Sequence, residues 1–191
     1  MILLIDNYDS FSYNLWQMLG TITEDIRVVR NDAMRIEEIE ELAPQGIVIS
    51  PGPGRPADAG ISEELITKLG GKVPILGVCL GEQAICETYG AVVTYAKTLM
   101  HGRQSVTSLD TSSPIFAGIP ESVRTARYHS LAVDEKTLPE ELHVIARADD
   151  GEVMGVAHKD FPVYGLQFHP ESIMTEYGAD MLKNFTRICG I

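Results

Sequence analysis

The sequence predicts an α/β fold: an open, mostly parallel sheet with helices on both faces and a smaller β-rich part in the second half. Three observations lead to this prediction. Continuous apolar runs such as residues 2–5 are typical of strands buried on both faces. Strand-like runs alternate with helix-like segments through the first half, which favours a parallel sheet. The hydrophobic fraction of 45% and charged fraction of 22% are typical of a packed globular domain.

The first half supplies strand–helix pairs in order. Ser10 could cap the first helix and Gly20 would end it, while Gly70 and Gly71 close the third. In the second helix, apolar residues recur at helical spacing, so its glutamates form a solvated face. The strands are expected at residues 2–5, 26–29, 46–50 and 73–78, and the helices at residues 11–19, 35–42, 62–69 and 82–89.

The second half changes character. It contains short, β-rich runs bounded by turn residues, and then an amphipathic helix near residues 175–188 that carries Met181, Leu182 and Phe185. No repeat or low-complexity linker divides it from the first half. The strands are expected at residues 105–109, 123–127, 131–133, 143–148, 153–157 and 163–168.

Length and charge limit the function. A chain of 191 residues predicts a single domain, residues 1–191. The net charge is −12, from 15 Lys and Arg against 27 Asp and Glu. Nucleic-acid binding is therefore not expected, because phosphate contacts need clustered cations. An acidic membrane surface is an equally poor partner.

The cellular compartment is inferred from segments and cysteines. No run approaches the roughly 18 apolar residues of a membrane span. The apolar N-terminus has neither a basic region before it nor a small-residue cleavage site, so we expect no signal peptide. Cys79, Cys86 and Cys189 form neither a CxxC pair nor an even disulfide framework. We expect a reduced, cytoplasmic protein.

Cys79 stands between Gly77 and Gly81, where a predicted strand runs into a predicted helix. This is the nucleophile-elbow pattern with cysteine as the nucleophile. The turn brings backbone segments close together, so a Cβ atom at either glycine would clash. The helix N-terminus favours a thiolate, and the free N–H of Leu80 can face an oxyanion.

The alternative is that Cys79 is a small buried hydrophobic residue, which is the usual fate of a free cysteine. The pentapeptide alone does not separate these interpretations. Cys86 and Cys189 lie on helical stretches among apolar neighbours and have no glycine frame. We interpret both as structural.

A thiolate nucleophile needs a base, and His169 is the best placed of the histidines. It follows the last strand-like run, and active sites form at the C-terminal ends of parallel strands. Pro170 stiffens the turn, and Glu171 could bond the far ring nitrogen and set the tautomer. Two alternatives are a surface histidine beside a solvated glutamate and a metal-binding pair, for which no third ligand has convincing spacing. The remaining histidines are at positions 101, 129, 143 and 158.

Two further segments follow strand-like runs. The turn at residues 51–54 follows another strand, so it lies at the same sheet edge, and its glycines could expose a backbone N–H to a substrate oxygen. It is not a P-loop, because no Gly-Lys-Ser/Thr follows. Residues 127–131 mix polar and apolar side chains after a β-rich run. Alone, this segment would pass for the end of a strand.

Taken together, these segments resemble the class I glutamine amidotransferases, the family with a Cys-His-Glu triad. The resemblance covers essentially the whole chain. The opening DNYDSFSYNL points to the chorismate-using branch, the glutaminase subunits (component II) of anthranilate synthase and aminodeoxychorismate synthase. The motifs that carry the resemblance are LLIDNYDSFSYNL, VISPGPGRP, ILGVCLGEQAI, MHGRQS, RYHSLAV and GLQFHPES.

The resemblance implies a flavodoxin-like α/β fold of the class I glutamine amidotransferase type, with Cys79 as nucleophile, His169 as base and Glu171 as its partner. The N–H groups of Gly54 and Leu80 would form the oxyanion hole. One departure is visible, because position 82 is Glu where the family often has His. Motif matching assigns glutamine binding to Gly52, Pro53, Gly54, Gln83, Ser130 and Leu131.

The implied activity is hydrolysis of L-glutamine to glutamate, with delivery of ammonia to a separate chorismate-using synthase subunit (component I). The resemblance implies no cofactor or metal in this chain, and Mg²⁺ in the partner. We expect the partner to contact Tyr8, Asp9, Ser10 and Phe11, which lie in the first strand-to-helix loop at the Cys79 edge. The other interpretation of Phe11 is that it only packs the first helix onto the sheet.

The leading hypothesis is anthranilate synthase component II, in tryptophan biosynthesis. The equivalent subunit of aminodeoxychorismate synthase, in folate biosynthesis, and a subunit that serves both pathways stay open. Further candidates are an amidotransferase of nucleotide synthesis, a cysteine peptidase and a non-catalytic scaffold subunit. The intact Cys79, His169 and Glu171 argue against a scaffold, and the glutamine-pocket motifs argue against a peptidase.

Overall fold

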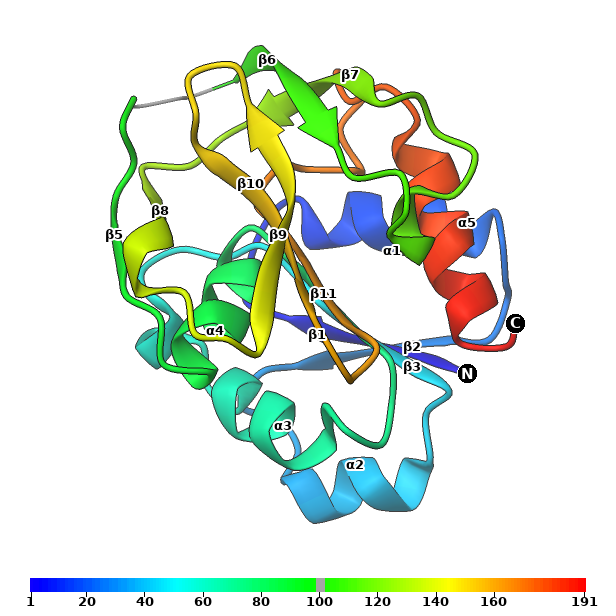
Figure 1. The fold of residues 1–191 in the computed structure, drawn as a ribbon. Helices are drawn as coiled ribbons and strands as arrows, with labels where there is room; N and C mark the ends of the chain where they lie inside the picture. Colours follow the sequence, from blue (N-terminus) through cyan, green and yellow to red (C-terminus); the bar gives the residue numbers. More distant parts are fainter. Residues whose placement is uncertain (99–101) are drawn as a thin grey trace.

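The computed structural model describes residues 1–98 and 102–191. Met100 and His101, within the MHGRQS motif, lie outside the described residues. A nine-stranded sheet runs through the molecule (Figure 1). Its strands, in spatial order, are β2 (Ile26–Arg30), β1 (Ile2–Asp6), β3 (Gly46–Ile49), β4 (Ile75–Val78), β11 (Val163–Leu166), β10 (Val153–His158), β9 (Leu142–Ala148), β6 (Arg103–Leu109) and β7 (Ser122–Arg127).

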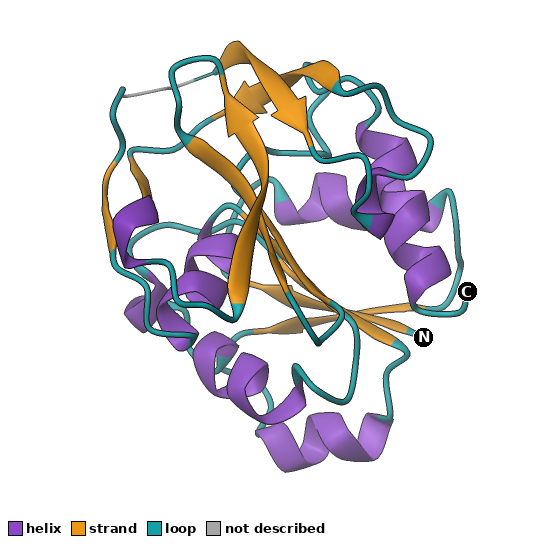
Figure 2. Ribbon diagram, viewed as in Figure 1, coloured by secondary structure: helices purple, strands orange, loops and turns teal. Residues whose placement is uncertain are grey.

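Helices cover both faces of the sheet (Figure 2), and the predicted α/β class is confirmed. The helices α1 (Ser12–Gly20) and α5 (Gly178–Ile188) pack on one face, and α2 (Ile36–Leu42), α3 (Ser62–Leu69) and α4 (Leu80–Thr88) pack on the other. Strand β1 shows why its apolar run is continuous. Ile2 and Leu4 belong to one core cluster, whereas Leu3 and Ile5 belong to the other.

The two halves of the sheet differ in strand direction. From β2 to β11 all neighbours are parallel, whereas from β11 to β7 all are antiparallel. The β-rich second half therefore mostly extends the same sheet. One expected strand, β8 (Leu131–Val133), instead pairs with β5 (Val93–Tyr95), which the sequence did not predict, in a separate two-stranded sheet. Short single-turn helices lie in the connections at Pro56–Asp58, Pro114–Phe116 and Glu135–Thr137.

Several helix starts differ from their expected positions. Ser10 does not cap α1, because Phe11 occupies the cap position and Ser10 is exposed. The Asp9 carboxylate accepts the Phe11 N–H instead, at 2.7 Å. Helix α4 begins at Leu80, two residues earlier than expected, because the turn before it is unusually tight. None of the described helices is long and apolar enough to cross a membrane.

The parallel half brings several loops to one edge of the sheet. Strands β1, β3, β4 and β11 all point the same way, so their C-terminal ends meet there. Asn7, just after β1, donates its backbone N–H to Ser50 Oγ and its side-chain amide to the Ser50 carbonyl, both at 2.9 Å. These bonds fix the turn that starts at Pro51 relative to the end of β1.

Candidate active site

Cys79 occupies a strained turn between β4 and α4. Its φ of 53° and ψ of −103° are unusual for a residue with a side chain. A Cβ atom at Gly77 would overlap the Gly81 carbonyl, and one at Gly81 would lie 2.5 Å from the Ile49 carbonyl oxygen. Both glycines are therefore needed for the close backbone packing that the sequence predicts. The turn leaves the sulfur at the N-terminus of α4, beside its partial positive charge.

His169 and Glu171 form a buried pair after β11. The His169 Nδ1 lies 2.7 Å from Glu171 Oε1. The opposite ring nitrogen, Nε2, is buried and makes no hydrogen bond of normal geometry within the described residues, although the His169 side chain interacts with Cys79. Burial alone lowers the pKa of His169. Interactions with Cys79 and Glu171 outweigh burial and raise this pKa to about 10, so the ring carries a proton at neutral pH.

Two aromatic rings pack against the imidazole of His169. The ring centroids of Phe11 and Tyr128 lie 5.2 and 5.0 Å from that of His169 and 5.1 Å from each other. Phe11 comes from the loop before α1, and Tyr128 follows β7. Phe11 therefore does more than pack the first helix onto the sheet, because it touches the imidazole directly.

A pocket of about 200 Å³ opens in front of Cys79. Gly52 lines it where the backbone passes close to its neighbours, since a Cβ atom there would lie 2.6 Å from Asn7 Cβ. Gly54 has a φ of +80°, which L side chains rarely adopt. The lining residues are Gly52, Pro53, Gly54, Cys79, Gln83, Tyr128, His129, Ser130 and Leu131.

The structure brings the predicted site residues together. Every residue assigned to glutamine binding lines this pocket, as does Cys79. Leu80 is the first residue of α4, so its N–H has no partner within the helix. His169 and Glu171 are buried beside the pocket rather than in its lining. Sequence reasoning missed Tyr128 and His129, although both belong to the RYHSLAV motif.

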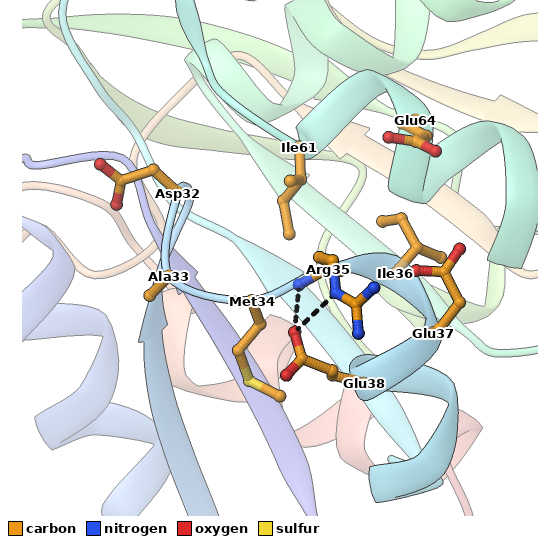
Figure 3. A pocket seen from close by; sticks show the side chains of 9 residues that line it. All are labelled: Asp32, Ala33, Met34, Arg35, Ile36, Glu37, Glu38, Ile61 and Glu64. Atoms are coloured by element: carbon orange, nitrogen blue, oxygen red, sulfur yellow. Dashed lines mark hydrogen bonds and ion pairs between the residues drawn. The ribbon is translucent and has the colours of Figure 1, made fainter.

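A larger hollow of about 440 Å³ lies elsewhere, between the start of α2 and the start of α3 (Figure 3). Its lining includes the carboxylates of Asp32, Glu37, Glu38 and Glu64. In Figure 3 the Glu38 carboxylate binds the backbone and side chain of Arg35, the one cation among the described residues that line the hollow. Such a lining repels carboxylate ligands. It also contains no residue of the six sequence motifs that carry the family resemblance. We therefore place the candidate active site at Cys79.

The family model for "Glutamine amidotransferase class-I" matches residues 3–189. The chain belongs to the class-I glutamine amidotransferases. This assignment confirms the resemblance inferred from the sequence motifs and the expected fold. It also agrees with the position of Cys79 at a strand-to-helix turn.

Curated relatives of this amidotransferase include component 2 proteins and longer proteins that the chain matches only in part. The chain is 51% identical to the aminodeoxychorismate/anthranilate synthase component 2 of Bacillus subtilis, covering 97% of this chain and 95% of the relative. It is 49% identical to anthranilate synthase component 2 of Pseudomonas aeruginosa, covering 98% and 95%. It is also 49% identical to the bifunctional protein TrpGD of Thermotoga maritima, covering 98% of this chain but only 32% of that longer protein.

Solved structures share the fold of this amidotransferase. A protein from Thermoplasma acidophilum, provisionally described as one subunit of a GMP synthase, superposes with a TM-score of 0.88 at 30% identity, covering 99% of this chain and 93% of that one. A glutamine amidotransferase from Thermotoga maritima superposes with a TM-score of 0.75 at 19% identity, covering 98% and 80%. The second likeness supports the fold alone.

The amidotransferase carries a buried carboxyl group at Glu82. Glu82 is completely buried in the first turn of α4, and its Oε2 atom has no hydrogen-bond partner within the described residues. The Cys86 thiol lies 3.4 Å from its other oxygen. Burial raises the pKa of Glu82 to about 8, so this side chain is mostly protonated at neutral pH.

We expect Glu82→Gln to flatten the pH dependence of stability. The folded-state pKa of about 8 exceeds the ordinary value of 4.5. The folded chain therefore holds a proton that the unfolded chain releases between these pH values, and stability falls as the pH rises through this window. Removing the titration should reduce the difference in unfolding free energy between about pH 5.5 and pH 8 by on the order of 3 kcal/mol.

Urea unfolding of the wild type and of Glu82→Gln at both pH values measures this effect. A glutamine substitution at the exposed Glu41 serves as the control and should leave the pH dependence unchanged. An equal pH dependence in the wild type and Glu82→Gln would mean that Glu82 is ionised in the fold.

The other two cysteines fit the structural interpretation. Both are free thiols, as is Cys79. Burial raises the pKa of Cys86 well above its ordinary value. Burial also raises the pKa of Cys189 to about 12, and its sulfur packs tightly against Gly46. Neither thiol is suited to act as a nucleophile at neutral pH.

Proposed function

We propose that this chain is a glutaminase subunit in which Cys79 is the nucleophile. The Cys79 sulfur attacks the γ-carboxamide carbon of glutamine, and the N–H groups of Leu80 and Gly54 stabilise the oxyanion. His169 gives its proton to the leaving nitrogen, so the C–N bond breaks and ammonia departs from a thioester. His169 then takes a proton from water, which attacks the thioester and releases glutamate. Glu171 orients and stabilises the imidazolium.

One observation carries this proposal: the strained Cys79 turn opens onto a pocket beside the buried His169–Glu171 pair. A scaffold subunit would have no need for a strained cysteine turn, which is energetically costly. The glutamine contacts proposed for the pocket come from Gly52, Pro53, Gly54, Gln83, Ser130 and Leu131, all of which line it.

We further propose that a chorismate-using synthase subunit, component I, receives the ammonia. The names of the relatives support this partner, and they cover both pathways: one is a component 2 of both synthases, another of anthranilate synthase and another of aminodeoxychorismate synthase. Anthranilate is the first candidate product and aminodeoxychorismate is the second. On this proposal the chain works as one cytoplasmic domain with no cofactor of its own, and Mg²⁺ serves only the partner.

The decisive experiment measures glutamate release from glutamine, alone and with each type of synthase subunit plus chorismate and Mg²⁺. We expect weak activity alone and strong activity with a cognate partner, and product analysis then identifies the pathway. No glutamate release with either partner would overturn the proposed function. Full activity without a partner would contradict control by the synthase.

The partner is expected to dock beside the first loop, at Tyr8 and Phe11. Tyr8 is half exposed, and its hydroxyl donates to the Asp32 carboxylate at 2.8 Å. A hollow of about 610 Å³ opens next to this loop, with Phe11, Tyr128 and the fully exposed Ile173 among its lining residues. Aromatic side chains around a hollow are typical anchors of a protein interface.

We expect Tyr8→Ala and Phe11→Ala each to weaken binding of the synthase subunit by about tenfold or more. The affinity decides the outcome rather than the rate, because Phe11 also touches His169. Phe161→Ala is the matched control, since Phe161 is an exposed aromatic residue in the turn between β10 and β11, at the opposite edge of the sheet. Wild-type affinity in both loop variants would remove this loop from the interface.

A further inference from the structure

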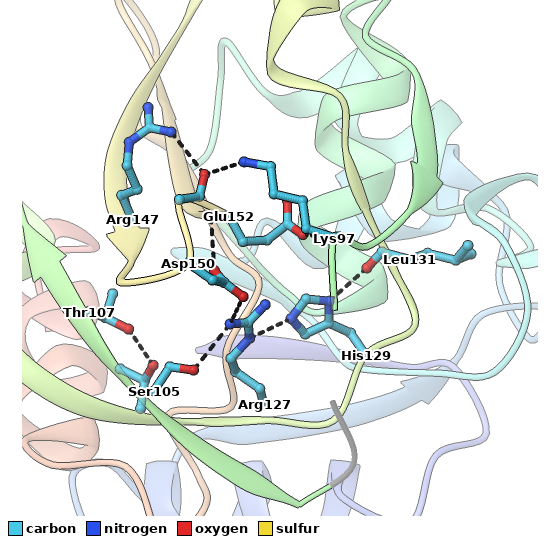
Figure 4. A network of polar contacts seen from close by, with 11 residues as sticks. Lys97, Ser105, Thr107, Arg127, His129, Leu131, Arg147, Asp150 and Glu152 are labelled. Atoms are coloured by element: carbon cyan, nitrogen blue, oxygen red, sulfur yellow. Dashed lines mark hydrogen bonds and ion pairs between the residues drawn. The ribbon is translucent and has the colours of Figure 1, made fainter. Parts of the chain in front are cut away.

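A buried guanidinium lies behind the pocket. The Arg127 side chain is completely buried at the end of β7. Its Nη1 donates to Asp150 at 2.7 Å and to Ser105 Oγ at 3.1 Å, and its Nε donates to His129 Nε2 at 3.2 Å (Figure 4). A buried charge of this kind is tolerated only with such partners. Arg127 thus joins the antiparallel half of the sheet to the segment that lines the pocket.

The neighbours of His129 determine its protonation. The Leu131 carbonyl, 2.8 Å from Nδ1, can only accept, so Nδ1 must carry a hydrogen. Arg127 Nε can only donate, so Nε2 must be bare. Burial lowers the pKa of His129 to about 4, and the positive charge of Arg127 acts in the same direction. His129 is therefore a neutral ring with both nitrogens bonded, which leaves it no role as an acid or base.

The Leu131 carbonyl links His129 to Gln83. It also accepts from Gln83 Nε2 at 3.1 Å, and the same nitrogen donates to Gln167 Oε1 at 2.9 Å. Both N–H groups of the Gln83 amide are thereby used, which leaves Oε1 as the atom available to a ligand. The carbonyl of Ser130 is held separately by the Ala96 N–H at 2.9 Å.

We propose that His129 is a positioning residue for substrate binding. Through the Leu131 carbonyl it fixes the segment at Ser130–Leu131 and orients Gln83 so that Oε1 accepts a hydrogen bond from an N–H group of glutamine. This inference rests on the proposed glutaminase function and deepens it. The contacts exist before the reaction starts and do not involve the reacting atoms, so their loss should raise KM and change kcat little.

Three substitutions at His129 separate this role from a general structural one. In His129→Asn the amide nitrogen can replace Nδ1 and still donate to the Leu131 carbonyl. In His129→Gln the amide group instead reaches the place of Nε2 and meets Arg127. His129→Ala makes neither contact. All three variants lose the imidazole ring, and only His129→Asn keeps the contact with the Leu131 carbonyl.

The measurement is steady-state glutaminase activity with the synthase subunit present, together with circular dichroism to confirm folding. We expect KM for glutamine to rise about tenfold or more in His129→Gln and His129→Ala, to stay within about threefold of wild type in His129→Asn, and kcat to change little throughout. His143→Asn, in β9, is the control and should match the wild type.

The possible results distinguish the two proposals. A wild-type protein that releases no glutamate with any partner would overturn the proposed function. An active wild type with unchanged KM in His129→Gln and His129→Ala would overturn only the positioning role. An equal rise in KM for Asn and Gln would also overturn it, since general damage to the segment would not distinguish the two amides. If His129→Ala does not fold, the comparison of Asn with Gln still decides.

Discussion

Cys79→Ala is expected to abolish glutamine-dependent synthesis while ammonia-dependent synthesis by the partner survives. The alanine variant has no atom that can form the thioester, so glutamate release should fall by at least about a thousandfold. On the proposed function the partner holds the second reaction, so added ammonium salt should restore product formation. The measurement is paired: product formed from glutamine and product formed from ammonia, with the same synthase subunit.

Cys86→Ala is the matched control, because it removes a thiol from the helix that follows Cys79. Cys86 is buried and its pKa is raised, so its loss should leave turnover nearly intact and cost only stability. Retained glutaminase activity in Cys79→Ala would refute the assignment of the nucleophile. Loss of the ammonia-dependent reaction as well would mean that the substitution disrupts the complex.

Glu171→Gln is expected to lower kcat by about 100- to 10,000-fold with little change in KM. The glutamine keeps the shape of the side chain, but its neutral amide cannot stabilise an imidazolium. It can also donate to Nδ1, which would force the wrong tautomer on His169. Because Glu171 is one of the groups that raise the pKa of His169, this pKa should fall in the variant.

Single-turnover kinetics and NMR titration of His169 test these two consequences separately. A slow reaction with a lowered His169 pKa would support an electrostatic role for Glu171. A wild-type rate in Glu171→Gln would reduce Glu171 to a structural partner of the ring, whatever the titration shows.

The sequence predicted the parallel half of the fold because local rules determine it. The apolar run of β1 is buried on both faces, and Gly77 and Gly81 are needed where a Cβ atom would strike the backbone. The pairing of β5 with β8 could not be predicted in this way. Residues 93–95 form a short strand with two exposed positions, so only a distant partner defines it.

The residues of the candidate site also differ in whether local rules predict their positions. Cys79, His169 and Glu171 follow buried strands, so sheet topology alone predicts that they meet. Tyr128 was missed because it contacts Phe11 and His169, which are far away in the sequence. His129 was missed because its link to the pocket runs through Gln83, which is also distant in the sequence. The bond between Arg127 and Asp150 spans 23 residues, and that between Gln83 and Leu131 spans 48. Side-chain periodicity carries no information on such contacts.

On the proposed function, the synthase acts as an allosteric ligand of the glutaminase reaction. The contact runs through the ring cluster of Phe11, Tyr128 and His169. A partner that binds Phe11 contacts a residue that itself touches the imidazole of His169. To raise the population of a productive His169 arrangement a hundredfold, its binding must favour that arrangement by about 2.7 kcal/mol. By thermodynamic reciprocity, a ligand that stabilises the same arrangement at Cys79 tightens synthase binding by the same factor. The subunit should therefore hold its partner most firmly while ammonia is being made.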